Sequence, residues 1–193
     1  MTPGSDADFV AQMLAEAARL HGESASAAGP AAAAAEAMVT ALRVGGRILA
    51  CGNGGSAADA QHFAAELVGR FERERAALAA IALTTDTSIL TALANDYDFA
   101  RVFGRQVEAL GRPGDVLLGI STSGGSANVI AAFAAAKAGG LTTVALTGRD
   151  GGAVGAAADI HINVPSPSTA RAQEVHRTLL HAICEIVERE LYA

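Results

Sequence analysis

The chain has 193 residues, of which 51% are hydrophobic, and it carries a formal net charge of −6 at pH 7. This length and hydrophobic content predict one globular domain over residues 1–193, with a single sizeable core. The acidic balance, with Lys and Arg scattered along the chain, argues against a basic nucleic-acid surface, so we expect no direct nucleic-acid partner.

The first residues, MTPGSDADFV, show neither a cationic nor an apolar signal region, and no later apolar run is long enough to span a bilayer. We therefore expect a cytoplasmic protein with no membrane partner. Cys51 and Cys184 lie far apart and lack CxxC spacing. This pattern predicts two reduced, packed thiols rather than a disulfide framework or a cysteine metal site.

The chain begins with a region of helical composition that extends to about Leu42. The interruption HGESASAAGP predicts two helices here, with Pro30 suited to the first turn of the second. Their small alanine side chains leave broad apolar faces that one domain of this size need not cover. We therefore expect the N-terminal helices, residues 1–45, to contribute to oligomerisation.

Five short β-rich runs follow, separated by helical segments or long connections: RILAC, AIALT, VLLGI, TTVALT and IHINV. This alternation predicts an α/β fold with a parallel sheet and helices on both faces. The runs are continuously apolar rather than alternating, as strands covered on both faces require. After the last run, apolar positions at near-helical spacing predict an amphipathic terminal helix over residues 171–191.

Two glycine-rich loops follow predicted strands and have the composition of a phosphate site. The first, CGNGGSAAD, offers Asn53 and Ser56 as side-chain donors next to a helix start. The second, STSGGSANV, surrounds a glycine pair with hydroxyls, at Ser121, Thr122, Ser123 and Ser126. The same residues could be helix caps and glycine turns. Because two such loops lie at equivalent strand ends, we favour the phosphate site; the spacings of a dinucleotide or Walker loop are absent.

Candidate metal ligands lie on two predicted helices. His62 and Glu66 are four residues apart and share a helix face, although such a pair alone is more often a surface contact or a packed histidine. The terminal helix offers Gln173, Glu174, His176 and His181, of which His176 is the weaker candidate because it could be a solvated helix residue. Gln173 and His181 are separated by about 12 Å of helical rise. They can share an ion only if both side chains lean together, or if Gln173 precedes the regular helix. Imidazole, carboxylate and amide donors suit zinc or a similar borderline divalent ion.

Five segments in this order resemble the SIS-domain (sugar isomerase) family, specifically its phosphoheptose isomerases: CGNGGSAADAQHFAAEL, ALTTDTSILTALANDYDF, GDVLLGISTSGGSANV, ALTGRDGG and QEVHRTLLH. The resemblance implies a flavodoxin-like three-layer sandwich with a five-stranded parallel sheet, assembled as a homotetramer with active sites at subunit interfaces. It implies a zinc site at His62, Glu66, Gln173 and His181. It also implies sugar-phosphate contacts at Asn53, Gly54, Gly55, Ser56, Glu66, Arg70, Asn95, Asp96, Ser121, Thr122, Ser123, Ser126 and Gln173.

The implied activity is isomerisation of D-sedoheptulose 7-phosphate to D-glycero-D-manno-heptose 7-phosphate through an enediol, with Glu66 as base and His181 as acid. One departure is Ala170, where some members carry an Asp, so any role of that Asp does not carry over. The family also includes a noncatalytic adaptor that binds the bacterial replication initiator, which is the alternative function. That branch lacks the helix carboxylate and the late histidine, so Glu66 and His181 favour the enzyme.

Overall fold

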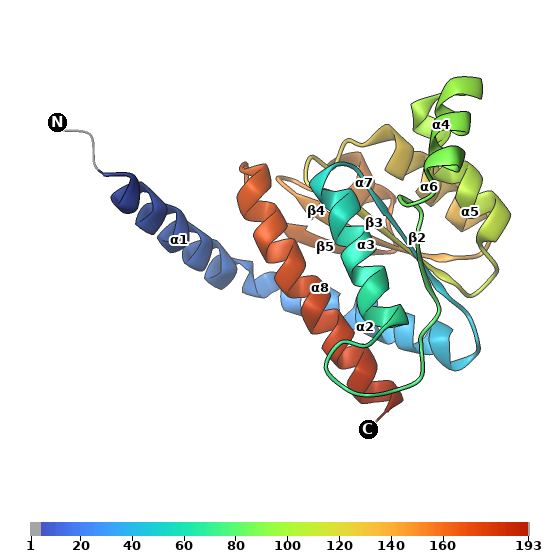
Figure 1. Ribbon diagram of the computed structural model, residues 1–193, viewed down its shortest axis with the longest axis horizontal. Helices are drawn as coiled ribbons and strands as arrows, with labels where there is room; N and C mark the ends of the chain where they lie inside the picture. Colours follow the sequence, from blue (N-terminus) through green and yellow to red (C-terminus); the bar gives the residue numbers. More distant parts are fainter. Residues whose placement is uncertain (1–4, 193) are drawn as a thin grey trace.

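The computed structural model describes residues 5–192, so Met1–Gly4 and Ala193 of the predicted domain lie outside the described residues. Its centre is a parallel sheet in the order β2-β1-β3-β4-β5 (Figure 1). The strands are β1 (Ile48–Gly52), β2 (Ala80–Ala82), β3 (Val116–Ser121), β4 (Thr142–Gly148) and β5 (Ile160–Val164). This is the flavodoxin-like order, and the predicted five-stranded α/β fold is confirmed.

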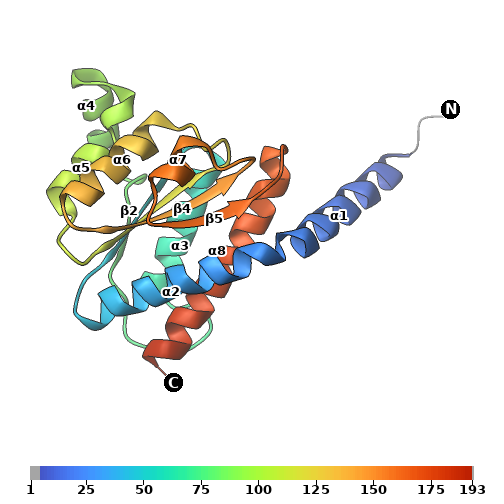
Figure 2. The ribbon, with the colours of Figure 1, turned by 180° about the vertical axis from the view of Figure 1, so that it is seen from behind.

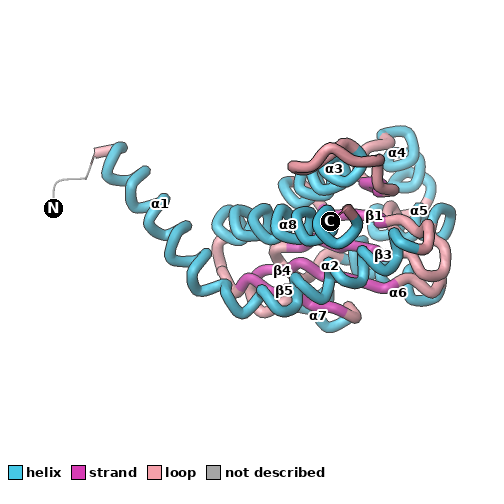
Figure 3. The backbone as a smooth tube through the Cα atoms, turned by 90° about the horizontal axis from the view of Figure 1, so that it is seen from below, coloured by secondary structure: helices cyan, strands magenta, loops and turns pink. Residues whose placement is uncertain are grey.

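Helices cover both faces of the sheet. One face packs against α2 (Ala28–Arg43), α3 (Gly55–Val68) and α8 (Thr169–Leu191). The other packs against α5 (Gly104–Leu110), α6 (Ala127–Ala138) and α7 (Gly152–Ala157), with α4 (Thr87–Asp96) and the short 3₁₀ turn η2 (Phe99–Arg101) beyond them. The three layers are visible when the molecule is viewed from below (Figure 3).

Each central strand supplies both cores, which explains its continuous apolar run. Ile48 and Ala50 of β1 belong to the core beneath α2, α3 and α8, whereas Leu49 and Cys51 belong to the core beneath α5 and α6. Cys184 packs into the first of these cores, and both cysteines are free and buried. The prediction of two reduced, packed thiols is therefore confirmed.

The N-terminal region forms the two predicted helices. α1 (Asp6–Glu23) begins at a capping box, in which the Ser5 side chain accepts from the Asp8 N–H and the Asp8 carboxylate accepts in return. The interruption is a single 3₁₀ turn, η1 (Ser24–Ala27), and Pro30 lies in the first turn of α2. α1 extends away from the body of the molecule (Figures 1 and 2). Within residues 5–192, none of the helices has the length and apolar character needed to cross a membrane.

The positions of β1 and β3 as neighbours in the sheet determine where the two glycine-rich loops lie. From β1 the chain crosses to β2 on one side, and β3 lies on the other side of β1. The loops that follow β1 and β3 therefore meet at the carboxyl edge of the sheet, the usual ligand position in such folds. Asn53 and Asn128 join these loops through two reciprocal side-chain hydrogen bonds of 2.9 and 2.8 Å.

Candidate active site and metal centre

Two imidazoles and a carboxylate converge between α3 and α8. His62 and Glu66 project from α3, with His62 Nε2 3.4 Å from Glu66 Oε1. His181 projects from α8 and places its Nε2 2.7 Å from His62 Nε2. The three ligand atoms lie within 4.8 Å of one another, and all three side chains are partly buried. The structure thus brings together three of the four predicted metal ligands, in a donor set that suits zinc.

The fourth predicted ligand, Gln173, lines the same cavity as His181. This cavity has a volume of about 530 Å³ and lies between the start of α3 and the first half of α8. Gln173 is the fifth residue of α8, so the alternative that it precedes the helix is wrong. Its amide packs over Gly55, where any Cβ atom would overlap it. Ala170 also lines the cavity, so this wall carries a methyl group where some family members carry a carboxylate.

The serine loop after β3 gathers hydroxyls at the start of α6. Ser121 Oγ lies 2.8 Å from Ser126 Oγ and 3.4 Å from Ser123 Oγ, and Thr122 is partly exposed beside them. The loop turns at Gly124, which has φ +67°, and a Cβ there would overlap the Gly151 carbonyl. Hydroxyls at a helix N-terminus form an arrangement that can hold a phosphate.

The loop after β1 contributes backbone more than side chains. Gly54 has φ +56° and is exposed, as is Gly55. The Asn53 amide is occupied by Asn128. Ser56, in the first turn of α3, is 3% exposed, and its backbone lies against Gly52.

Two predicted substrate residues, Asn95 and Asp96, lie away from the cluster in this chain. Asn95 and Asp96 are exposed at the end of α4, where the Asn95 amide donates to Asp96 at 2.8 Å. α4 packs on η2 and lies apart from α8 (Figure 1). The Arg70 side chain is 57% exposed and forms a 3.7 Å ion pair with Glu74. A single subunit therefore does not bring Asn95 and Asp96 to the histidine pair.

His176 differs from its expected position. It is fully buried rather than solvated, and its Nε2 donates to the Thr147 carbonyl at 2.9 Å. Burial lowers the pKa of His176, which the hydrogen bond to Thr147 and the nearby Asp59 charge only partly oppose. His176 is therefore a packed core residue and not a member of the ligand cluster.

Sequence reasoning missed a polar pair at the cavity wall. Asp59, 2% exposed, accepts from Arg177 Nη2 at 2.7 Å, which links α3 to α8. Both residues line the cavity. The spacing offered a signal, because Asp59 precedes His62 by three residues and Arg177 precedes His181 by four, so each shares a helix face with a predicted ligand.

Comparison with known proteins shows the family to which the chain belongs. Residues 10–148 match the sequence pattern of the SIS domain. The phosphoheptose isomerase of Roseiflexus sp. (strain RS-1) is 64% identical over 160 residues, which are 83% of this chain and 81% of that protein. The phosphoheptose isomerase of Aromatoleum aromaticum is 58% identical over 183 residues, which are 93% and 92% of the two chains.

Solved structures agree as well. The phosphoheptose isomerase of Neisseria gonorrhoeae matches with a TM-score of 0.91 at 53% identity, over 96% of this chain and all of that one. The protein from Francisella tularensis matches over the same shares with a TM-score of 0.92 at 40% identity. These comparisons confirm the family resemblance inferred from the five sequence segments. The chain belongs to the SIS-domain family and, within it, to the phosphoheptose isomerases, which are enzymes.

Proposed function

We propose that this chain converts D-sedoheptulose 7-phosphate into D-glycero-D-manno-heptose 7-phosphate through an enediol. One observation carries the proposal: α3 and α8 bring two imidazoles and a carboxylate together at the edge of a cavity of about 530 Å³. The relatives named phosphoheptose isomerase support the class of substrate.

The reaction moves one proton from carbon 1 of the ketose to carbon 2, and the substrate and product are isomers. It needs a base for the carbon-bound proton and an acid at the substrate oxygens. We assign the first role to Glu66, which removes the proton at carbon 1 and returns it to carbon 2 of the enediol. We assign the second role to His181, which exchanges a proton with the substrate oxygens.

The donor set also fits a zinc ion. His62, Glu66 and His181 present two nitrogens and an oxygen to one point, and Gln173 lines the adjoining wall. These four residues would hold the ion, which when bound would polarise the substrate carbonyl. The Nε2 atom of His181 can donate a proton or ligate an ion but not both at once. Its two roles therefore belong to different stages of turnover.

The two loops at the carboxyl edge would hold the rest of the substrate. We propose that Ser121, Thr122, Ser123 and Ser126 bind its phosphate, with the α6 N-terminus behind them. The other proposed contacts come from the loop after β1 and from Glu66 and Gln173 on the helices: Asn53, Gly54, Gly55, Ser56, Glu66 and Gln173.

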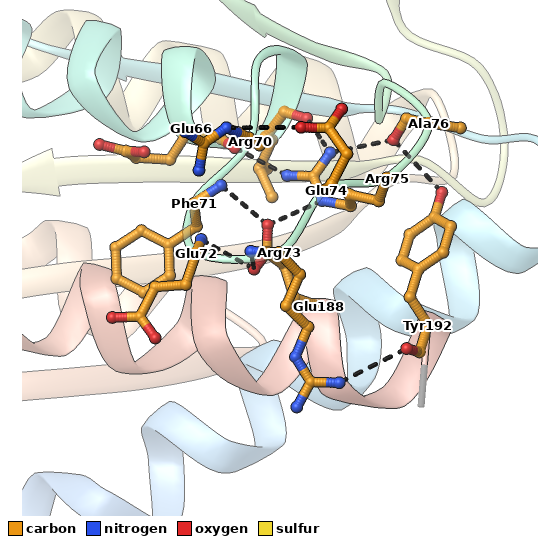
Figure 4. Close-up of polar contacts among 11 residues, drawn as sticks. Glu66, Arg70, Phe71, Glu72, Arg73, Glu74, Arg75, Ala76, Glu188 and Tyr192 are labelled. Carbon is orange, nitrogen blue, oxygen red and sulfur yellow. Dashed lines mark hydrogen bonds and ion pairs between the residues drawn. The ribbon is translucent and has the colours of Figure 1, made fainter.

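A homotetramer would explain the residues that lie apart. Every residue of α4 is at least partly exposed, as expected for a helix that a second copy covers. We propose that the chain is one domain that assembles as a homotetramer through its N-terminal helices, residues 1–45. Asn95 and Asp96 would then reach a site on a neighbouring subunit, whereas Arg70, four residues beyond Glu66, would contact the substrate from this chain (Figure 4). We further propose that the enzyme acts in the cytoplasm.

The test incubates purified protein with sedoheptulose 7-phosphate and identifies the product by NMR. Formation of an aldose heptose 7-phosphate is the expected result, and its loss on chelation with recovery on added zinc supports the metal. If the protein produces no aldose but binds a bacterial replication initiator, the isomerase proposal is wrong and the adaptor function replaces it.

A further inference from the structure

A buried ion pair lies behind the proposed catalytic residues. The Glu188 carboxylate, on α8, is 1% exposed, and the Arg75 side chain that meets it at 2.8 Å is completely buried. Removing two charges from water is costly, and many cores replace such pairs by apolar residues at no loss of stability. The question is what this pair does that an apolar contact would not.

Glu188 holds the loop that follows α3. Its two carboxylate oxygens accept three successive backbone N–H groups, from Phe71 at 2.8 Å and from Glu72 and Arg73 at 3.0 Å each. Figure 4 shows the carboxylate at the centre of this turn. These four bonds, including that from Arg75, use the acceptor capacity of the carboxylate and hold its pKa down to about 2, well below its usual value.

Arg75 carries the connection to the end of α3. Its Nη2 donates to the main-chain carbonyl of Glu66 at 2.8 Å, and its Nη1 donates to that of Leu67 at 2.9 Å. The last carbonyls of a helix have no partner within the helix, so Arg75 acts as the cap of α3. The last turn of α3, which carries the Glu66 side chain, is therefore fixed to α8 through Arg75 and Glu188 (Figure 4).

The same network reaches His181 from the other side. Glu188 follows His181 by seven residues, so both lie on one face of α8, separated by about 10 Å of rise. Phe71, whose N–H is bound to Glu188, places its ring 5.4 Å from the His181 ring, measured between centroids. One carboxylate thus determines the position of the backbone behind Glu66 and of the ring beside His181.

We propose that Glu188 and Arg75 are positioning residues for the isomerase, which set the separation of Glu66 and His181 across two helices. The inference rests on the proposed function, which assigns those two residues to proton transfer and to the metal. It predicts that a change in the network alters kcat and zinc affinity while substrate binding at the serine loop is retained.

Arg75→Lys is the main test. Lysine keeps the charge beside Glu188, but its one nitrogen replaces three separate nitrogens, Nε, Nη1 and Nη2, that donate to Glu188, Leu67 and Glu66 in the native protein. Kinetics are corrected for the folded fraction from circular dichroism, and zinc affinity is measured by competition with a chelator. We expect at least a tenfold fall in kcat with KM within about threefold of the wild-type value, and zinc binding weakened by about 10–100-fold.

Arg73→Lys is the matched control, because its exposed side chain lies in the same loop while its N–H still binds Glu188.

Phe71→Leu is the second variant, for the case in which Arg75→Lys does not fold. This variant keeps the hydrogen bond from the residue 71 N–H to Glu188 and removes only the ring beside His181. We again expect kcat to fall while KM stays close to the wild-type value. A purely structural network would lower the unfolding temperature of the variant that folds and leave its corrected kcat and zinc affinity at wild-type values, which would overturn the proposal. Absence of isomerase activity in the wild type would contradict the proposed function alone, since zinc affinity in the same samples still tests the positioning.

Discussion

The 2.7 Å separation between His62 Nε2 and His181 Nε2 restricts the chemical state of both rings. Two nitrogen lone pairs at this distance repel each other, so either one ring donates a proton to the other or both face a cation. Glu66 adds a carboxylate to the same group, with its Oε1 3.4 Å from His62 Nε2. The group therefore fits either a hydrogen bond between the two rings or a metal ion held between α3 and α8.

Glu66→Gln and His181→Asn test this group directly. Each variant is close in shape to the native residue, yet it removes a group that can exchange protons, and we expect each to lower kcat by about 10²–10⁴-fold. Substrate binding should suffer less, because the serine loop is unchanged. Zinc content is measured alongside the rate, so that lost chemistry is distinguished from a lost ion. Turnover within twofold of wild type in either variant would rule out the role assigned to that residue.

Two glycines of the site should respond differently to the same substitution. In Gly55→Ala the new methyl group meets only the movable amide of Gln173, so we expect near-native stability with reduced zinc affinity and turnover. In Gly124→Ala the methyl group meets the Gly151 backbone at a positive φ, so we expect about 1–3 kcal/mol of lost stability. Urea unfolding and zinc titration of both variants measure the difference. Equal stability losses would contradict this assignment.

The sequence could predict residues that act through local spacing, and not those that act across the chain. His62 and Glu66 are one helical turn apart, so their shared face follows from the sequence. The partners of Asp59 and of Arg75 lie 118 and 113 residues away, and only the packing of α8 on α3 selects them. From charge alone, Asp59 could pair with many basic residues of the chain, and Arg75 with many acidic ones.

At the scale of elements, the strands were predicted well because burial on both faces leaves a continuous apolar run. The predicted strand RILAC, residues 47–51, corresponds to β1 at Ile48–Gly52. The second run was predicted to extend to Thr84, but β2 ends at Ala82 because only three residues pair with β1. Such boundaries depend on the partner strand, which composition does not specify.

The connection from α8 to the end of α3 should make the free energy of unfolding depend on pH in the acidic range. The pKa of Glu188 is lowered from 4.5 to about 2 in the folded protein, so its contribution is complete above about pH 5 and is lost as the pH falls towards 2. Glu188→Gln should therefore lower the free energy of unfolding by about 3 kcal/mol at pH 7, and this difference should shrink at pH 3. Urea unfolding at a fixed protein concentration measures both values. Glu185→Gln, an exposed change on the same helix, is the control, and a difference independent of pH would contradict the assignment.

At the scale of the whole molecule, α1 is the element that the fold of one chain does not explain. It projects from the body with Phe9, Val10 and Leu14 exposed by 55–67% (Figure 2). Exposed apolar side chains grouped on one helix mark an interaction surface. This projection supports the proposed assembly through the N-terminal helices.

Light scattering of the native protein should therefore report a tetramer. Joint substitution of Phe9→Glu and Leu14→Glu places charges on the exposed apolar positions of α1, and we expect a shift to smaller species. Ala15→Glu adds a charge to an exposed position on the opposite side of the same helix and should leave the assembly unchanged. A wild-type monomer with full activity would contradict the shared-site proposal.

The two buried thiols lie in separate cores, and this placement makes them reporters of local opening. Cys51 of β1 lies beneath α5 and α6, and Cys184 of α8 lies in the core shared with α2 and α3. Burial raises the pKa of each thiol to about 12. Because only the thiolate reacts readily, alkylating reagents should label neither residue until its layer separates from the sheet. Mass spectrometry of samples labelled over time would then follow the two helical layers independently. It would show whether the layer that carries His62, Glu66 and His181 opens before the layer that begins at the serine loop.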